Sequence, residues 1–207
     1  MRIYLVRHGE SEGNKERVFQ DPKSPFSPDG QLQAQSVAKR FDGIPIDLLF
    51  ASPYTRADMT AQAISNKLGV KVEYWDDLHE IKRPVTLIGK SIHSDEARLF
   101  EQHLLNSYQN SKPKLDGEEG FNDLRLRAQK ILSHLVKNHQ NQNILLVSHA
   151  TTIKSIVFEA IFGENLNSKI FWNIRRHIIT KNTGVTILEY SKKRGWVLVT
   201  WGDVSHL

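Results

Sequence analysis

The sequence predicts an α/β fold, a three-layer sandwich with a mostly parallel central sheet and helices on both faces. Two observations lead to this prediction. Short apolar runs that suit strands alternate along the chain with segments whose apolar residues recur every three or four positions, as in helices. One run, Ile144-Leu145-Leu146-Val147, is apolar throughout, which is typical of a parallel strand buried on both faces of its sheet. Strands that alternate with helices favour a covered parallel sheet.

The first strand is expected over residues 3–6, and it ends directly in Arg7-His8-Gly9. Residues 15–26 are rich in charged residues, proline and serine, which indicates a loop, and such a loop beside a glycine-bearing site often covers it. The next three residues, Ser27-Pro28-Asp29, predict the start of a helix: a serine N-cap, a proline in the first position and an acid in the first turn. Gly43 and Pro45 are expected to end that helix.

The second strand is expected over residues 47–51, and a helix follows it. Thr55 and Asp58 have the spacing of a capping box, which predicts Thr55 as the N-cap and places Arg56 in the first turn. A third strand is expected over residues 70–75, after a helix that ends at Gly69.

Residues 81–118 have the least regular pattern, with a helix indicated over residues 96–108. The apolar residues from Phe121 to Leu135 step by three or four and predict an amphipathic helix. The apolar strand at 144–147 ends in Ser148-His149, and a further helix is expected through Ile161.

Two strands are predicted near the end of the chain, over residues 184–190 and 196–201. Lys192-Lys193-Arg194-Gly195 lies between them and indicates a hairpin turn. Arg175-Arg176-His177 is likewise expected to form a solvent-exposed turn.

A chain of 207 residues, 39% hydrophobic and 25% charged, is expected to form a single domain over residues 1–207, with 81–118 as an insertion that lines the substrate pocket. The absence of cysteine excludes disulfides, cysteine nucleophiles and thiolate zinc sites. Because no apolar run is long enough to span a membrane, we expect no membrane partner and a cytoplasmic location. The net charge of +5 favours anionic partners.

Ionisable side chains follow three of the predicted strands: Arg7 and His8, Arg56, and His149. Because the carboxyl ends of parallel strands meet at the edge where α/β proteins bind ligands, we expect these side chains to lie close together. Two guanidinium groups and an imidazole match the charge and the oxygens of a phosphate monoester. Phosphoryl transfer depends mostly on positioning and charge stabilisation, so such a set could support catalysis. Taken singly, each group could also be an ordinary surface ion-pair partner or strand-end histidine.

No metal or cofactor is expected from the sequence. His79-Glu80 has no second histidine four residues further on. His134 and His139 are five residues apart, which is poor spacing for ligands on one face of a helix.

Several blocks, in order, resemble the histidine phosphatase superfamily, the phosphoglycerate-mutase-like enzymes. They are Arg7-His8-Gly9, Ser27-Pro28-Asp29-Gly30, Ser52-Pro53 with Thr55-Arg56-Ala57, Leu78-His79-Glu80-Ile81, Gly117-Glu118-Glu119 with Arg127, and Val147-Ser148-His149. The chain departs from the family pattern at Ala150, where glycine is common, and at Lys82-Arg83-Pro84, where a glycine and an acidic segment usually follow the glutamate.

The resemblance implies a nucleophile, a general acid and a phosphoryl-binding set. His8 would attack phosphorus, and Glu80 would protonate the leaving alkoxide and later accept a proton from water. Asp76, Asp77 and His79 are the alternatives to Glu80 in the acid role. The phosphoryl group would be bound by Arg7, Asn14, Arg56 and His149.

The implied function is that of a metal-independent phosphomonoester phosphatase, a histidine acid-phosphatase-type phosphoric monoester hydrolase that acts on a small phosphorylated metabolite through a phosphohistidine. The alternatives are a phosphoglycerate mutase and, in another class, a non-catalytic phosphate- or nucleic-acid-binding module. A small-molecule phosphate ester is the expected partner and nucleic acid is not, because aromatic and basic residues are not interleaved. A homodimer is left open. Lys82, Arg83, Arg175 and Arg176 are candidates to border the substrate pocket.

Overall fold

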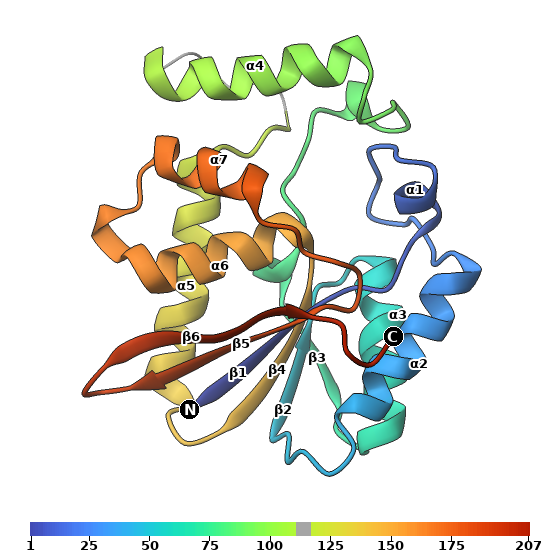
Figure 1. The fold of residues 1–207 in the computed structure, drawn as a ribbon, viewed down its shortest axis with the longest axis vertical. Helices are drawn as coiled ribbons and strands as arrows, with labels where there is room; N and C mark the ends of the chain where they lie inside the picture. Colours follow the sequence, from blue (N-terminus) through green and yellow to red (C-terminus); the bar gives the residue numbers. More distant parts are fainter. Residues whose placement is uncertain (111–116) are drawn as a thin grey trace.

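The computed structural model describes residues 1–110 and 117–207, and within them it shows one six-stranded sheet of order β3-β2-β4-β1-β5-β6 (Figure 1). The parallel part is formed by β1 (Arg2–Arg7), β2 (Leu48–Ala51), β3 (Val72–Tyr74) and β4 (Asn143–Ser148). The antiparallel part is the hairpin of β5 (Val185–Ser191) and β6 (Gly195–Asp203), and β5 pairs with β1. The predicted α/β class with a mostly parallel sheet is confirmed.

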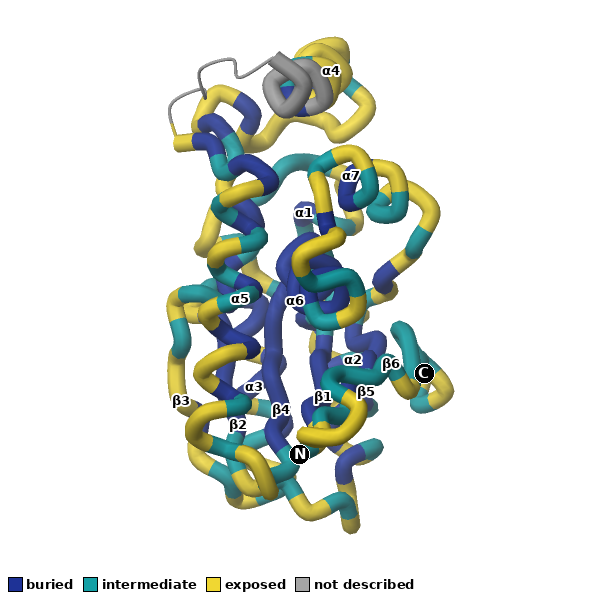
Figure 2. The backbone as a smooth tube through the Cα atoms, turned by 90° about the vertical axis from the view of Figure 1, so that its left-hand side faces the viewer, coloured by how far each residue is buried: buried dark blue, intermediate teal, exposed yellow. Residues whose placement is uncertain are grey.

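Helices cover both faces of this sheet. On one face lie α2 (Pro28–Arg40) and α3 (Thr55–Leu68), and on the other lie α5 (Phe121–Asn138) and α6 (Ala150–Phe162). Alternate residues of β4 serve the two cores: Leu145 and Val147 pack with α2 and α3, whereas Ile144 and Leu146 pack with α5 and α6. This is why β4 is apolar throughout, and Figure 2 shows it as a buried line through the molecule.

The end of the molecule above the carboxyl ends of the parallel strands is covered by α4 (Asp95–Asn110), which lies against α7 (Ser168–His177) (Figure 1). The short helix α1 (Glu12–Lys15) lies at the same end. The remaining elements are single 3-10 turns: η1 (Asp76–Leu78), η2 (Val85–Leu87) and η3 (Gly163–Asn165). None of the helices in the described residues is both long and apolar enough to cross a membrane.

The two predicted helix starts have different outcomes. Ser27 caps α2 as predicted, because its hydroxyl accepts a hydrogen bond from the Gly30 N–H at 3.1 Å. The prediction of Thr55 as an N-cap is wrong, since α3 already begins at Thr55 and Tyr54 is the N-cap residue. The Tyr54 carbonyl accepts the first helical bonds, from the N–H groups of Ala57 and Asp58. Arg56 still falls in the first turn, as expected.

The prediction of an exposed turn at 175–177 is also wrong, because these residues form the last turn of α7. Asn167 caps this helix through the Ile170 N–H at 3.0 Å, and Phe171 and Trp172 bury one face of it. The Arg175 guanidinium lies over the Trp172 ring, 4.7 Å from its centroid. The predicted turn at 192–194 is confirmed as the β5–β6 connection.

Two glycines let the exit of β1 pack tightly against the start of α2. A Cβ atom on Gly9 would lie 2.6 Å from the Gly30 carbonyl oxygen, and one on Gly30 would overlap the Glu10 carbonyl. Gly9 therefore allows one stretch of backbone to approach another closely.

Candidate active site

The carboxyl ends of β1, β2 and β4 stop at the same level. Arg7 pairs with Ser148, and Ala51 pairs with Val147. The backbone pairing of β1 with β4 extends one residue further, since the His8 N–H donates to the Ser148 carbonyl at 3.0 Å. This register brings together side chains that are far apart in the sequence, as the strand-end pattern predicted.

His8 is buried at this edge, and its ring is oriented by two contacts. Its Nδ1 lies 2.7 Å from the Gly9 carbonyl oxygen, so this nitrogen carries the proton and donates to that oxygen. Its Nε2 is then the basic nitrogen, and it accepts a hydrogen bond from Nε of Arg56 at 3.2 Å. The arrangement leaves the Nε2 lone pair as the nucleophilic position of the ring.

The surroundings keep His8 neutral. Burial lowers the pKa of His8 well below its ordinary value of 6.5, and the positive charges of Arg56 and Arg7 lower it further. A neutral imidazole retains its lone pair at physiological pH, which a nucleophile requires.

His149 lies behind His8, with the two ring centroids 5.0 Å apart. It is fully buried as the N-cap residue of α6, and its Nε2 lies 2.8 Å from the Ser52 hydroxyl oxygen. Its Nδ1 is buried and has no hydrogen-bond partner among the described residues. Burial, followed by the charge of Arg56, lowers the pKa of His149 well below its ordinary value.

Two guanidinium groups flank His8. Arg7 donates from Nη1 to the Thr180 carbonyl at 2.6 Å, and Arg56 donates from Nη1 to the Asp21 carbonyl at 2.9 Å. Burial lowers the pKa of Arg7 to about 10, so the group is still protonated at neutral pH. Nε of Arg7 is buried without a hydrogen-bond partner in the described part of the chain. The pair supplies two fixed positive charges beside the His8 ring.

A cavity of about 620 Å³ opens over this cluster, and five of the six predicted site residues line it: Arg7, His8, Asn14, Arg56 and Glu80. The sixth, His149, is buried beside His8 and is not part of the cavity surface. Residues 18–22 and residues from Ile81 to Ile92 form much of the wall. Both Lys82 and Arg83 contribute to it, whereas Arg175 and Arg176 do not line this cavity.

Of the four predicted candidates for the acid, Glu80 is the one that lines the cavity. Its carboxylate accepts hydrogen bonds from the backbone N–H of Ile81 at 2.9 Å and of Thr151, in the first turn of α6, at 3.2 Å. The alternatives lie elsewhere: Asp77 pairs with Lys130, His79 is buried, and neither they nor Asp76 line the cavity. The structure thus separates candidates that are adjacent in the sequence.

The segment before Glu80 is anchored by three side chains for which no role was predicted from the sequence. Arg127 donates from Nη1 to the carbonyls of Asp77 and His79, at 2.7 and 2.8 Å. Thr152 donates its hydroxyl to the same His79 carbonyl at 2.5 Å, and Ser148 donates to the Leu78 carbonyl at 2.6 Å. Arg127 and Ser148 lie within the blocks that carry the family resemblance, which was the available signal.

Asn14 is oriented by a residue that sequence reasoning missed. Asn182 donates from Nδ2 to the Asn14 side-chain oxygen at 3.1 Å and to the His8 carbonyl at 2.9 Å. The Ser11 hydroxyl donates to the same Asn14 oxygen at 3.0 Å. Since the side-chain oxygen of Asn14 already accepts these two hydrogen bonds, the amide nitrogen of Asn14 is the group left to donate to a ligand. Asn182 lies in a turn with no periodic pattern, so no local signal marked it.

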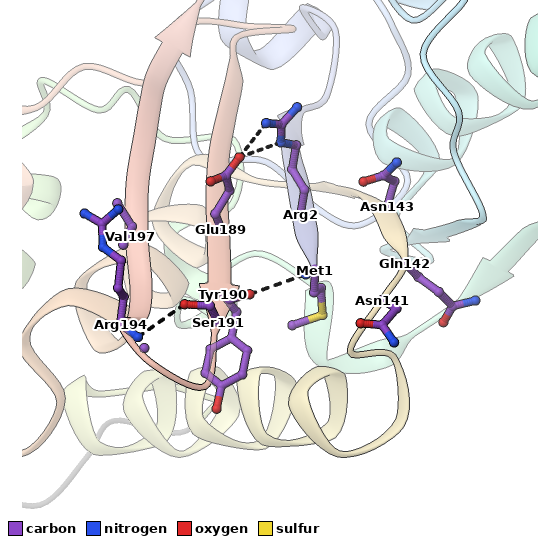
Figure 3. A pocket seen from close by; sticks show the side chains of 11 residues that line it. Met1, Arg2, Asn141, Gln142, Asn143, Glu189, Tyr190, Ser191, Arg194 and Val197 are labelled. Carbon is purple, nitrogen blue, oxygen red and sulfur yellow. Dashed lines mark hydrogen bonds and ion pairs between the residues drawn. The ribbon is translucent and has the colours of Figure 1, made fainter.

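A second hollow, of about 350 Å³, lies at the opposite end of the sheet, between the start of β1 and the β5–β6 hairpin (Figure 3). Its charged groups include Arg2 and Glu189, which pair with each other. The described residues that line it include no histidine. Arg7, His8 and Arg56 line the first cavity and not this one. Nor do the described residues contain a cluster of three histidine, aspartate or glutamate side chains that could hold a metal ion.

The buried neutral histidines predict a pH-dependent stability. Below pH 6.5 the unfolded chain protonates His8 and His149 while the folded chain does not, so the unfolded state binds more protons and stability falls as the pH falls. The loss should approach about 1.4 kcal/mol per pH unit for each histidine. Urea unfolding between pH 5 and 7.5 measures it. His149→Asn keeps a good N-cap residue and should flatten the slope; identical slopes for both proteins would contradict the assignment.

A family model described as "Histidine phosphatase superfamily (branch 1)" matches residues 3–204 of the chain. A probable phosphoglycerate mutase GpmB of Salmonella choleraesuis is 30% identical over 214 aligned residues, which span 100% of this chain and 95% of that protein.

Solved structures share the same fold. Bacillus stearothermophilus YhfR superposes with a TM-score of 0.82 at 26% identity, covering 99% of this chain and 98% of that one. A phosphoserine phosphatase mutant of Entamoeba histolytica, in complex with phosphoserine, gives a TM-score of 0.83 at 23% identity, with 100% and 98% covered.

Proposed function

Because the chain belongs to the histidine phosphatase superfamily, we propose that it is a metal-independent phosphatase that hydrolyses a small phosphate monoester through a phosphohistidine on His8. The observation that carries the proposal is the state of His8: a neutral ring, with its proton on Nδ1 and its basic Nε2 beside Arg56. This is the arrangement that nucleophilic attack on phosphorus requires.

The reaction has two steps in this proposal. His8 Nε2 forms a bond to phosphorus while the bond from phosphorus to the leaving oxygen breaks, and the Glu80 carboxyl gives its proton to that oxygen. Water then attacks the phosphohistidine and Glu80 takes a proton from it. The N–P bond breaks, which releases inorganic phosphate and restores His8 and Glu80.

The charge of the transferring group is met by the two arginines. Arg7 and Arg56 present fixed guanidinium groups, and a hydrogen bond to a charged group contributes roughly 1.5–3 kcal/mol. The Asn14 amide and the buried Nδ1 of His149 are further groups proposed to bind phosphoryl oxygens. Because these groups are held in place before substrate binds, little reorganisation is needed during the reaction.

A phosphoglycerate mutase is the second candidate, favoured by the relative of that name and by the presence of Lys82 and Arg83 on the cavity wall. A mutase must exclude water from its phosphoenzyme and needs a second anion site. The Arg83 guanidinium lies over the rings of Phe19 and Phe100, at 5.7 and 5.3 Å from their centroids. Because the Arg83 guanidinium packs against two aromatic rings, we interpret Arg83 as part of the packed cavity wall.

Phosphorus NMR distinguishes the candidates. The protein is given 3-phosphoglycerate with a trace of bisphosphoglycerate, or a generic aryl phosphate, and the products are followed. We expect inorganic phosphate from the aryl ester and no efficient conversion to 2-phosphoglycerate. Efficient isomerisation with little inorganic phosphate would establish the mutase instead. A failure to release phosphate from any ester, with phosphate still bound, would favour the non-catalytic binding module.

A further inference from the structure

The cavity over His8 has an apolar wall. It contains the hydrophobic or aromatic residues Val18, Phe19, Val85, Ile88 and Ile92. Large apolar side chains here remain exposed, at 81% for Val85 and 46% for Ile92. A contiguous exposed apolar surface that adjoins a set of fixed polar groups is the usual form of a small-molecule site.

This wall is built from two segments that are distant in sequence and are tied by backbone hydrogen bonds. The Phe19 N–H donates to the Lys90 carbonyl at 2.9 Å, and the Gly89 N–H donates to the Phe19 carbonyl at 2.8 Å. The Ile92 N–H donates to the Arg17 carbonyl at 2.9 Å. Arg17 has a φ of 56°, a strained conformation for a non-glycine residue that these bonds maintain. The wall is therefore preformed.

The cavity is also much larger than a phosphoryl group requires. Its volume of about 620 Å³ lies in the range of pockets that enclose a whole small organic molecule. The wall of residues 18–19 and 85–92 presents mainly side chains that gain by contact with apolar atoms, and Lys82 and Arg83 also line the cavity.

We propose that the preferred leaving group is apolar, an aryl or branched alkyl group that packs on this wall while its phosphate lies at His8. The inference rests on the proposed phosphatase function and narrows it to a substrate class. An apolar group covers the exposed side chains of Val85, Ile88 and Ile92 without giving up hydrogen bonds to water, so this contact favours apolar esters over polar ones.

A series of n-alkyl phosphates tests this with the unmodified protein. Ethyl, butyl and hexyl phosphate have leaving groups of nearly equal basicity and differ in apolar surface. We expect kcat/KM to rise by about two- to fourfold for each added methylene, and hexyl phosphate to exceed 3-phosphoglycerate. A flat or falling series with hydrolysis retained would overturn the substrate class alone. Absence of hydrolysis for every ester would overturn the proposed function.

Variants of the apolar wall test whether the preference for longer alkyl phosphates depends on it. Ile88→Asn and Ile92→Asn replace side chains that are 36% and 46% exposed, so folding should tolerate them. Each should reduce the ratio of hexyl to ethyl phosphate kcat/KM by about three- to tenfold. Leu32→Asn, at an exposed position of α2 away from the cavity, is the matched control and should leave the ratio unchanged. An unchanged ratio in both wall variants would contradict the proposal.

Discussion

His8→Ala should abolish phosphatase activity, with kcat falling by roughly 10⁴-fold or more, the scale seen when a catalytic nucleophile is removed. The alanine variant lacks the Nε2 atom proposed to attack phosphorus, and no other histidine of the described structure lines the cavity. We do not expect His149 to substitute, because it does not line the cavity and its Nε2 is engaged with the Ser52 hydroxyl at 2.8 Å.

Rapid-quench trapping measures the intermediate directly. Labelled substrate should leave label on the protein in a form stable to base and labile to acid, as for a phosphohistidine, and His8→Ala should carry none. His149→Asn is the matched control, because it changes the neighbouring ring and keeps the nucleophile. Label on His149 or on a serine would overturn the assignment.

Glu80→Gln should lower the rate for alkyl phosphates by roughly 10²–10⁴-fold, the usual contribution of general acid catalysis. Glutamine keeps the shape and an oxygen to accept from the N–H groups of Ile81 and Thr151, but it has no proton to give to the leaving alkoxide. An activated aryl phosphate needs little protonation, so its hydrolysis should be affected far less.

Steady-state rates on both substrates provide the measurement. Asp76→Asn is the matched control: it removes a nearby acid that does not line the cavity, and it should leave both rates near those of the unmodified protein. Equal slowing of both substrates by Glu80→Gln would exclude Glu80 as the acid. A larger loss in Asp76→Asn would move the role to that residue.

Local patterns in the sequence were sufficient to predict the six strands and the helices α2 to α6, but not α7. Alternate residues of β1 and β4 face two different cores, so both strands contain unbroken apolar runs, and such runs can be recognised from the local sequence alone. The starts of helices were predicted less accurately. Thr55 has a capping spacing, but its N–H donates to the Pro22 carbonyl and Tyr54 takes the N-cap position. The competing partner comes from a segment far away in the sequence.

The sequence by itself also determined that Arg7, His8, Arg56 and His149 follow strands, and a parallel sheet then brings such ends together. Only the tertiary structure decided which nitrogen of His8 is basic, through the Gly9 carbonyl, and that Glu80 rather than Asp76 reaches the cavity. The same holds for Asn182 and for the apolar wall. The His8–Gly9 contact is local, but it depends on how the ring is oriented at the end of the buried strand; the other features depend on contacts between residues distant along the chain, and none of these leaves a periodic pattern in the sequence.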